Sequence, residues 1–384
     1  MADDHLQRAI TEEFKNKVRA GKVLILLGPR RVGKTALIHA YIKTQKTSDY
    51  LLLNGDDQAA LDVLSERTVV NYQRLLKGVK LLVIDEAQQV PDIGLKLKLI
   101  VDTIPDVAVI ATGSSVFDLG NKLGEPLVGR SNTLRLYPLA QMEFGVKENY
   151  LQTKEKLDER LIFGSYPELE KYGSWEEKSE YLEGLVNDYL LKDILEYEGI
   201  RKSGKIMDLL RLIAFQVGKE VSLDELAKGL KGISRNTVEL YLDLLSKVFV
   251  IYNVRGFSRN LRKEITKTSR WYFYDNGIRN TIIRNLNPLN FRNDIGELWE
   301  NYLMAERRKY NAYTRRRVNS YFWRTYDQQE IDLVEEKGVV LNAFEFKWNE
   351  SRKVKEPGGW QSGYPDATFE VITPQNYLEF IVGD

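Results

Sequence analysis

One stretch near the amino terminus constrains the fold more than any other part of the chain. Residues 28–35 read Gly-Pro-Arg-Arg-Val-Gly-Lys-Thr, follow the apolar run 23–27 and precede the apolar-periodic run 36–42. A strand, a G-x-x-x-x-G-K-T loop and a helix in this order are typical of a phosphate-binding loop in an α/β sheet. The residues that we predict to bind a nucleotide are Gly28, Pro29, Arg30, Arg31, Val32, Gly33, Lys34 and Thr35.

The chemistry of this loop favours a nucleoside triphosphate. Its glycines let successive N–H groups converge on one anion, and the helix that follows adds a partial positive charge. Lys34 is expected to reach the β- and γ-phosphates, and the hydroxyl of Thr35 is expected to bind Mg²⁺. The alternative is a glycine turn that precedes a lysine by chance, but the flanking strand and helix argue against it. We therefore predict ATP and Mg²⁺ as cofactors.

A second motif lies at residues 81–86, where an apolar run ends in Asp85 and Glu86. Such a run predicts a buried parallel strand, and open α/β sheets bind their ligands at the carboxyl ends of the strands. We expect Asp85 to hold the hydrated Mg²⁺ ion. Glu86 is expected to act as general base for the attacking water.

Two further positions each have a functional and a structural interpretation. Ser114 follows the apolar run 107–111 and is predicted either to contact the γ-phosphate or to cap a helix. Arg130 precedes the run 134–138. It is predicted either to reach a neighbouring subunit as an arginine finger or to pair with a local acid on the surface.

The motifs GPRRVGKT, LLVIDEA, ATGSS and GR, in this order, resemble those of the AAA-type P-loop ATPases over residues 1–140. The resemblance implies a parallel sheet, a nucleotide at a subunit interface and a homo-oligomeric ring, such as a hexamer. It also implies that Arg130 is the finger. We find no sensor arginine in the helical segment 141–204, which we interpret as a lid or linker.

Composition narrows the remaining possibilities. The chain has 384 residues, 43% of them hydrophobic, which is enough for two or three domains with cores of their own. The absence of cysteine excludes disulfides, and two histidines argue against zinc or Ser-His-Asp chemistry. Any divalent metal should therefore bind to carboxylates. Because no secretion signal or membrane-spanning apolar run is evident, we expect a cytoplasmic protein without membrane contact.

Residues 205–276 have the pattern of a winged helix. Two helical stretches, a turn at Gly232 and a third helix precede two β-rich stretches, with a basic loop between the latter. A recognition helix presents its first residues to DNA. The residues that we predict to contact DNA are Arg235, Asn236, Thr237, Arg259, Arg262 and Lys263. The alternative is a module that is purely structural or that contacts proteins.

Residues 277–384 contain a second candidate site. Asp332 lies on a predicted strand, and Glu345 and Lys347 lie on one face of the next strand. A hairpin would bring the two carboxylates together, where they can hold a divalent metal that activates water while the lysine neutralises charge on a phosphate. Glu297, on the preceding helix, is a candidate to complete the metal shell. The alternative is a solvated strand face with a surface Glu–Lys pair.

This set of residues resembles the restriction-endonuclease-like, or PD-(D/E)XK, nuclease core, with Glu-Ile-Asp at 330–332 in place of its P-D half. The whole chain, including Tyr-Phe-Tyr-Asp-Asn-Gly at 272–277, resembles a family of prokaryotic ATP-binding proteins whose last domain has no known function. The predicted fold class is α/β. A P-loop AAA-type core with a parallel sheet precedes a winged-helix domain and, at 277–384, an α/β restriction-endonuclease-like domain.

The leading interpretation is an ATP-hydrolysing protein that acts on DNA, with a metal-dependent nuclease-like C-terminal domain. Its predicted catalytic residues are Glu86, Arg130, Glu297, Asp332, Glu345 and Lys347. One alternative is a nucleotide-gated regulatory ATPase that binds DNA or protein without cleavage. The other is a protein-remodelling ATPase. Because the formal net charge is only +1, contact with nucleic acid would depend on local basic patches.

Overall fold

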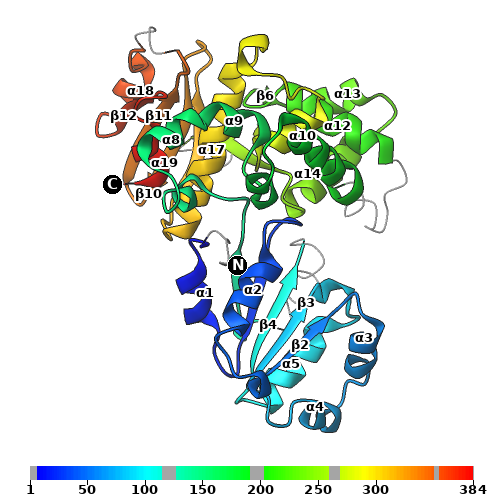
Figure 1. The fold of residues 1–384 in the computed structure, drawn as a ribbon. Helices are drawn as coiled ribbons and strands as arrows, with labels where there is room; N and C mark the ends of the chain where they lie inside the picture. The colour runs from blue at the N-terminus through cyan, green and yellow to red at the C-terminus, as the bar shows by residue number, and fades with distance from the viewer. Residues whose placement is uncertain (1–6, 115–126, 191–202, 259–268, 350–353, 384) are drawn as a thin grey trace. The chain divides into compact units, whose positions relative to one another are not determined.

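The chain folds into two compact units, each described by itself (Figure 1). The computed structural model describes residues 7–114, 127–190, 203–258, 269–349 and 354–383. Unit 1 comprises Met1–Tyr137 and Lys247–Phe249, and unit 2 comprises Pro138–Ser246 and Val250–Asp384. Within the described ranges, none of the helices has the length and apolar content that a transmembrane segment needs.

Unit 1 is built on a parallel sheet, which confirms the predicted fold class. Its strand order is β2-β3-β4-β1-β5, and all neighbouring strands run parallel. The strands are β1 (Val23–Leu27), β2 (Tyr50–Asn54), β3 (Leu81–Asp85), β4 (Ala108–Gly113) and β5 (Ser131–Arg135). The central strands β1 and β4 are buried along their whole length, because helices cover both faces of such a sheet.

The helices of unit 1 precede or connect these strands (Figure 1). They are α1 (Thr11–Lys17), α2 (Lys34–Ile42), η1 (Thr47–Asp49), α3 (Gln58–Ser65), α4 (Val69–Leu75), η2 (Ala87–Gln89) and α5 (Ile93–Thr103). Helix α2 follows β1 directly after the glycine-containing loop, as the sequence predicts. The loop and the end of β3 therefore lie at the same, carboxyl edge of the sheet.

Unit 2 contains a sheet of seven strands in the order β12-β11-β10-β9-β7-β8-β6. The strands are β6 (Glu220–Val221), β7 (Ile251–Gly256), β8 (Ser269–Phe273), β9 (Asn319–Arg324), β10 (Glu330–Lys337), β11 (Val340–Phe346) and β12 (Thr368–Ile372). Strands β7 and β9 pair in parallel, with Gly256 opposite Phe322. The sheet therefore continues across residue 276, where we predicted a domain boundary.

The helices of unit 2 pack around this sheet. They are α7 (Gln141–Phe144), α8 (Tyr150–Glu155), α9 (Leu157–Phe163), η3 (Pro167–Lys171), α10 (Trp175–Gly184), η4 (Leu185–Leu190), α12 (Ser203–Phe215), α13 (Leu223–Leu230), α14 (Arg235–Lys247), α16 (Asn276–Ile282), η5 (Leu289–Phe291), α17 (Ile295–Tyr313), α18 (Gly358–Gly363) and α19 (Tyr377–Val382).

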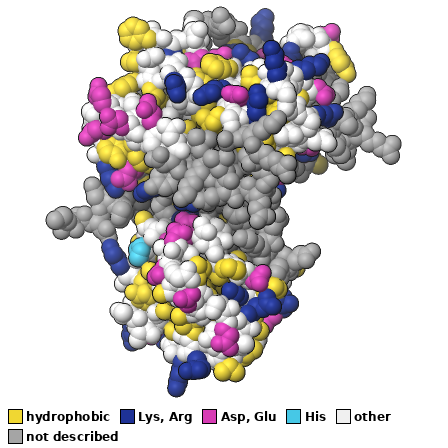
Figure 2. All heavy atoms as spheres, turned by 90° about the vertical axis from the view of Figure 1, so that its right-hand side faces the viewer, with side chains coloured by type: hydrophobic (Ala, Val, Ile, Leu, Met, Phe, Trp, Pro, Cys, Tyr) yellow, Lys and Arg dark blue, Asp and Glu magenta, His cyan; other side chains and the backbone are white. Residues whose placement is uncertain are grey.

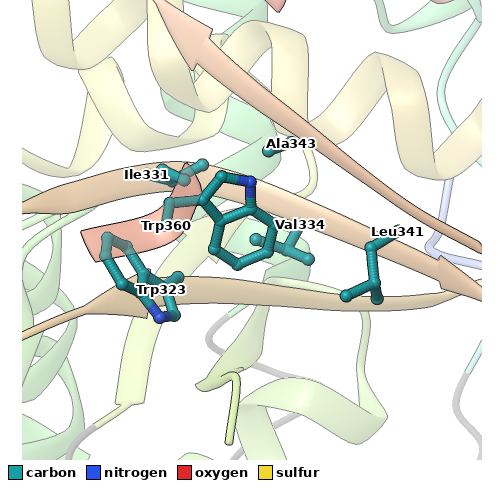
Figure 3. Close-up of a cluster of buried hydrophobic side chains, with 6 residues drawn as sticks. All are labelled: Trp323, Ile331, Val334, Leu341, Ala343 and Trp360. Atoms are coloured by element: carbon teal, nitrogen blue, oxygen red, sulfur yellow. The ribbon is translucent and has the colours of Figure 1, made fainter. Parts of the chain in front are cut away.

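An aromatic cluster holds the C-terminal part of the sheet together (Figure 3). The indole rings of Trp323 and Trp360 meet edge to face, with their centroids 5.4 Å apart. The other buried members are Ile331, Val334, Leu341 and Ala343. These side chains come from β9, β10, β11 and α18, so α18 packs against one face of the hairpin β10–β11.

The stretch 272–277 is a structural junction. The carboxylate of Asp275 accepts the N–H groups of Gly277, at 2.9 Å, and of Ser165, at 2.7 Å. The amide of Asn276 donates to the carbonyl oxygens of Leu161 and Leu298, at 3.1 Å and 3.0 Å. These bonds tie the start of α16 to α9 and α17. The polar side chains of Asp275 and Asn276 therefore hold elements of unit 2 together.

Substitution of Gly277 by alanine is expected to destabilise unit 2, by about 3 kcal/mol, because added atoms overpack a closed junction. A Cβ at this position would lie 1.9 Å from the carbonyl oxygen of Phe163. All six tryptophans lie in unit 2, so denaturant unfolding followed by tryptophan fluorescence measures this unit. Gly296→Ala is the control, because its Cβ would meet nothing within 4 Å. Equal stability of the two variants would contradict the prediction.

Candidate functional site

The loop 28–33 has the backbone geometry of an anion cradle. Gly33 has φ 92°, in the left-handed region that favours glycine. Gly28 is required for a different reason, because a Cβ there would lie 2.1 Å from the carbonyl oxygen of Leu136. Both glycines of the motif therefore have a structural cause, and α2 begins at the next residue, Lys34.

Lys34 reaches back over the loop that it follows. Its Nζ donates to the carbonyl oxygens of Gly28 and Pro29, at 2.8 Å and 2.9 Å, and the side chain is buried. An ammonium group in this position faces the space enclosed by the loop, where the charge of a triphosphate would be neutralised. The remaining loop residues predicted to contact the nucleotide are Arg30, Arg31 and Val32.

A hydrogen-bonded set of oxygen atoms lies beside the loop. The hydroxyl of Thr35 donates to Oδ2 of Asp85 at 2.8 Å, and the hydroxyl of Thr112 donates to Oδ1 of the same carboxylate. The N–H of Glu86 donates to the Thr112 hydroxyl at 3.0 Å. Hydroxyl and carboxylate oxygens are donors that Mg²⁺ prefers, so Thr35 and Asp85 fit this ion.

Glu86 occupies a constrained position directly after β3. Its φ of 48° is in the left-handed region, and Nε2 of Gln88 donates to its Oε2 at 2.5 Å. A Cβ on Gly55 would lie 2.3 Å from the Glu86 carbonyl oxygen, so this glycine leaves room for the turn. Strain of this kind is common where a side chain must be aimed at a ligand.

Two residues that support this site were missed by the sequence analysis. Arg8 is buried and donates to the carbonyl oxygens of Val32, at 2.5 Å, and Tyr137, at 2.7 Å, which braces the loop. Thr112, near the end of β4, is the polar residue that contacts Asp85, in place of the predicted Ser114. Ser114 is buried one residue beyond the end of that strand.

Arg130 lies at the opposite edge of the sheet from the loop. Its backbone oxygen accepts the N–H of Val23, the first residue of β1, whereas the loop follows the last residue of that strand. Its Nε pairs with Oδ1 of Asp102 at 2.5 Å, and both side chains are partly exposed. The local ion pair that we considered as the alternative interpretation is therefore present.

The second candidate site lies at the start of the hairpin β10–β11. The register pairs Leu333 with Phe344, which brings Asp332 to Glu345. The β10–β9 register shifts between Ile331 and Val334, and Oδ2 of Asp332 accepts the N–H of Phe346 at 2.9 Å. A bulge here turns the carboxylate towards the neighbouring strand. Both Asp332 and Glu345 are buried, which excludes a solvated strand face.

Lys347 and Glu300 complete this carboxylate cluster. Nζ of Lys347 donates to Oε1 of Glu345 at 2.6 Å. Glu300, on α17, accepts the hydroxyl of Tyr272 at 2.7 Å and interacts electrostatically with Asp332. The predicted Glu297 lies one turn earlier, where it pairs with Lys219 at 3.6 Å. The helix carboxylate of the cluster is therefore Glu300, a correction of the sequence-based assignment.

The carboxylates of this cluster resist simultaneous ionisation. Burial, followed by the nearby charge of Asp332, raises the pKa of Glu345 to about 7 and that of Glu300 to about 8. Burial likewise raises the pKa of Asp332. Crowded, buried carboxylates favour protonation or a cation beside them.

Asp332 and Glu345 supply oxygen donors for a divalent ion, and Mg²⁺ commonly binds through one or two protein carboxylates. Among the described residues, however, no three acidic or histidine side chains lie close enough together to hold a metal ion. Arg270 lies in the cluster instead, with Nη1 3.4 Å from Oδ1 of Asp332. The residues present therefore fit a metal through this carboxylate pair alone.

The positions predicted to contact DNA are only partly described. Arg235 and Asn236 are exposed at the start of α14, and Thr237 accepts or donates a hydrogen bond with Ser234 at 2.9 Å. Arg235 pairs loosely with Asp224 at 3.6 Å. Arg259, Arg262 and Lys263 lie outside the described residues. Figure 2 shows positive and negative side chains interspersed over the face that it presents.

Three parts of the chain match known domain families. Residues 20–145 match the family of AAA domains. Residues 154–289 match a domain of unknown function (DUF8612), and residues 295–374 match another (DUF4143). The AAA match and the geometry of the loop identify residues 20–145 as an AAA-type ATPase domain.

The chain is also similar to uncharacterised proteins along most of its length. It is 25% identical to one from Methanocaldococcus jannaschii, over 95% of this chain and 84% of the relative. It is 24% identical to one from Mycobacterium tuberculosis, over 89% and 74%. It is 24% identical to one from Haemophilus influenzae, over 90% and 87%.

Solved structures with a similar chain include replication initiators. One is DnaA bound to AMPPCP and single-stranded DNA, at 18% identity and a TM-score of 0.31, over 62% of this chain and 86% of that one. Another is domain III of Thermotoga maritima DnaA, at 20% identity and a TM-score of 0.31, over 58% and 88%. TM-scores of this size do not by themselves establish a shared fold.

Proposed function

We propose that this AAA-type ATPase acts on DNA and that its C-terminal carboxylate cluster is a metal-dependent nuclease site. The observation that carries the proposal is the buried pair Asp332 and Glu345, with Lys347 beside it, at a bulge of the sheet. Buried carboxylates without full pairing are costly, so their presence together favours a functional role over a structural one.

At the nucleotide site, this chain's residues bind and orient ATP. Lys34 neutralises phosphate charge, while Thr35 and Asp85 would hold Mg²⁺, which supplies further charge neutralisation when bound. Glu86, aimed by its left-handed backbone and by Gln88, accepts a proton from the attacking water. Oligomerisation into a ring would allow Arg130 to act on a neighbour's nucleotide, provided that it leaves Asp102.

Contact with DNA is proposed for the helices of unit 2. The proposal is supported by the order α12, β6, α13, α14, β7, β8, which resembles that of a winged helix, and by the pairing of both β6 and β7 with β8. The exposed Arg235 and Asn236 lie at the start of α14, the part of a recognition helix that meets bases or phosphates. The pairing of Arg235 with Asp224 is exposed and therefore weak.

At the carboxylate cluster, Asp332 and Glu345 would hold a divalent metal. Such an ion, when bound, lowers the pKa of water and neutralises charge on a phosphodiester. Lys347 is positioned by Glu345 at 2.6 Å, where its ammonium group can neutralise charge that develops on a scissile phosphate. We propose these three residues as the catalytic set and Glu300 as a further carboxylate beside it.

One observation favours a second candidate, a nucleotide-gated regulatory ATPase that binds DNA without cutting it. Arg270 already contacts Asp332, so the cluster has a cation of its own. In that case the nuclease-like part of unit 2 would serve as a binding surface.

Cleavage of labelled single-stranded, linear and branched DNA tests the proposal, with Mn²⁺ and with or without ATP. Asp332→Asn is expected to lower the rate of DNA cleavage by a factor of about 10² or more, because the carboxylate cluster loses a metal-binding charge. ATP hydrolysis is expected to stay at the wild-type rate, because the nucleotide site is unchanged. Asp366→Asn changes an exposed acid of unit 2 and serves as the matched control.

The same DNA substrates distinguish the nuclease from the two other candidate functions. DNA binding without any cutting by the wild type would favour the regulatory ATPase. Failure to bind any of the DNA substrates would favour a protein-remodelling ATPase instead. Cutting that survives in Asp332→Asn would show that the nuclease activity does not belong to this cluster.

A further inference from the structure

Arg270, on β8, lies among the carboxylates of the second site. Its Nη2 is 2.9 Å from Oε2 of Glu330, and its Nη1 is 3.4 Å from Asp332 and 3.8 Å from Glu300. Its guanidinium also covers the ring of Phe322 at 4.7 Å. The side chain is buried, with 3% of its surface exposed. A single cation thus faces three acids that come from two different elements, α17 and β10.

The fit of this arginine is poor in comparison with a second buried arginine of unit 2, Arg307 on α17. Nε and Nη2 of Arg307 donate to both oxygens of Glu335, at 2.9 Å and 2.7 Å, and its Nη1 donates to the carbonyl oxygen of Phe380. Arg270, by contrast, makes one close contact and two long ones. In the described part of the chain its Nε has no hydrogen-bond partner. Arg307 therefore has the geometry of a permanent bidentate pair, whereas Arg270 is held mainly by charge.

The acids of this cluster outnumber its cations, which favours the binding of a cation of higher charge. Among the described residues, the charged groups beside Glu300, Asp332 and Glu345 include one further acid, Glu330, and two cations, Arg270 and Lys347. An arginine cannot lose its charge at accessible pH, so it can relieve this excess only by its position. A divalent ion carries twice the charge and binds the same oxygens at shorter range.

We infer that Arg270 is an internal counter-ion that occupies the carboxylate cluster in its metal-free form, and that a divalent cation binds there by displacing its guanidinium. The inference rests on the proposed metal site. It adds that Arg270 and the metal ion compete for the same carboxylates. It accounts for the absence, within the described residues, of any three acids close enough to share a metal, because the guanidinium lies between them. Metal affinity is thereby lowered by a built-in competitor.

Titration of the full chain with Mn²⁺ tests this inference in an Asp85→Asn background without nucleotide, which removes the metal site of unit 1. Arg270→Met keeps the packing over Phe322 but removes the charge. It is expected to bind Mn²⁺ at least about tenfold more tightly than its parent, because the repulsion between two cations is lost. Calorimetry measures the affinity directly. Thermal unfolding followed by tryptophan fluorescence provides a second readout, in which Mn²⁺ stabilises Arg270→Met more than the parent.

Two further variants complete the design. Adding Asp332→Asn to Arg270→Met is expected to abolish the tighter binding. Arg324→Met, which removes a partly exposed arginine paired with Glu220 at 2.9 Å, is expected to leave Mn²⁺ binding unchanged. If Arg270→Met folds only with Mn²⁺ present, that rescue supports the inference, and Arg270→Lys provides a folded variant with the expected affinity close to that of the parent.

The outcomes distinguish this inference from the function on which it rests. Equal Mn²⁺ affinity in the parent and in Arg270→Met would overturn the competition while leaving the metal site in place. A complete lack of Mn²⁺ binding in both would overturn the metal site and the competition together. Tighter binding that persists after Asp332→Asn would place the ion elsewhere and would also overturn the inference.

Discussion

Glu86→Gln is expected to slow ATP hydrolysis by a factor of about 10² to 10⁴ while ATP still binds, because glutamine has the shape of glutamate without its basicity. The lost group is the proposed proton acceptor for the attacking water. Gln88 donates a hydrogen bond to Glu86, and we assign it no contact with the phosphates. Phosphate release measures hydrolysis, and a fluorescent ATP analogue measures binding in the same preparation.

Lys34→Ala is the comparison variant, because it is expected to differ from Glu86→Gln in ATP binding. Its buried ammonium group is the one that we propose to neutralise the phosphates, so this variant is expected to lose ATP binding as well as hydrolysis. Lys46→Ala, at an exposed lysine of the same unit, should behave as the wild type. Hydrolysis at the normal rate in Glu86→Gln would exclude Glu86 as the base and redirect the search to other polar groups near Asp85.

Arg307→Met is expected to lower the free energy of unfolding of unit 2 by about 3–5 kcal/mol, because it leaves a buried carboxylate without its bidentate partner. Glu335 is fully buried and would retain Asn311, at 2.6 Å, and Arg316, at 3.9 Å. Denaturant unfolding followed by tryptophan fluorescence reports on unit 2, which holds every tryptophan of the chain.

The double variant Arg307→Met with Glu335→Leu separates charge from packing. Replacing both members of a buried pair by apolar residues often restores stability, so the double variant is expected to recover most of the loss. A double variant as unstable as Arg307→Met alone would show that the arginine acts through packing against Phe380 instead, since its guanidinium lies 4.4 Å from that ring.

The geometry of the glycine-containing loop was predictable because its signal is local. The glycine-containing loop, the strand before it and the helix after it adjoin one another in sequence, and the apolar run that ends at Asp85 marks the second strand by itself. What the sequence could not reveal was Arg8, which contacts Tyr137 across 129 positions of the chain. A single arginine in an amphipathic segment carries no signal of such a long-range contact.

The carboxylate cluster was predictable only in part. The hairpin and its facing residues Asp332 and Glu345 follow from period-two alternation and a short turn. The choice between Glu297 and Glu300 does not, because residues three apart lie on nearly the same side of a helix and only packing decides which one faces the sheet. Arg270 was missed because it reaches Asp332 from a strand 62 positions earlier, through a sheet that joins two predicted domains.

The parallel pairing of β7 with β9 has a consequence for folding during synthesis on the ribosome. Strands β6, β7 and β8 are complete once residue 273 has emerged, but the outer edge of β7 gains its partner only when β9, at Asn319–Arg324, follows. An unpaired strand edge is a template for aggregation, and domains usually fold as units while the chain grows. The edge of β7 therefore stays unpaired from the synthesis of residue 273 until β9 has been made. A chain stalled in this interval would expose a strand edge that is paired in the mature sheet.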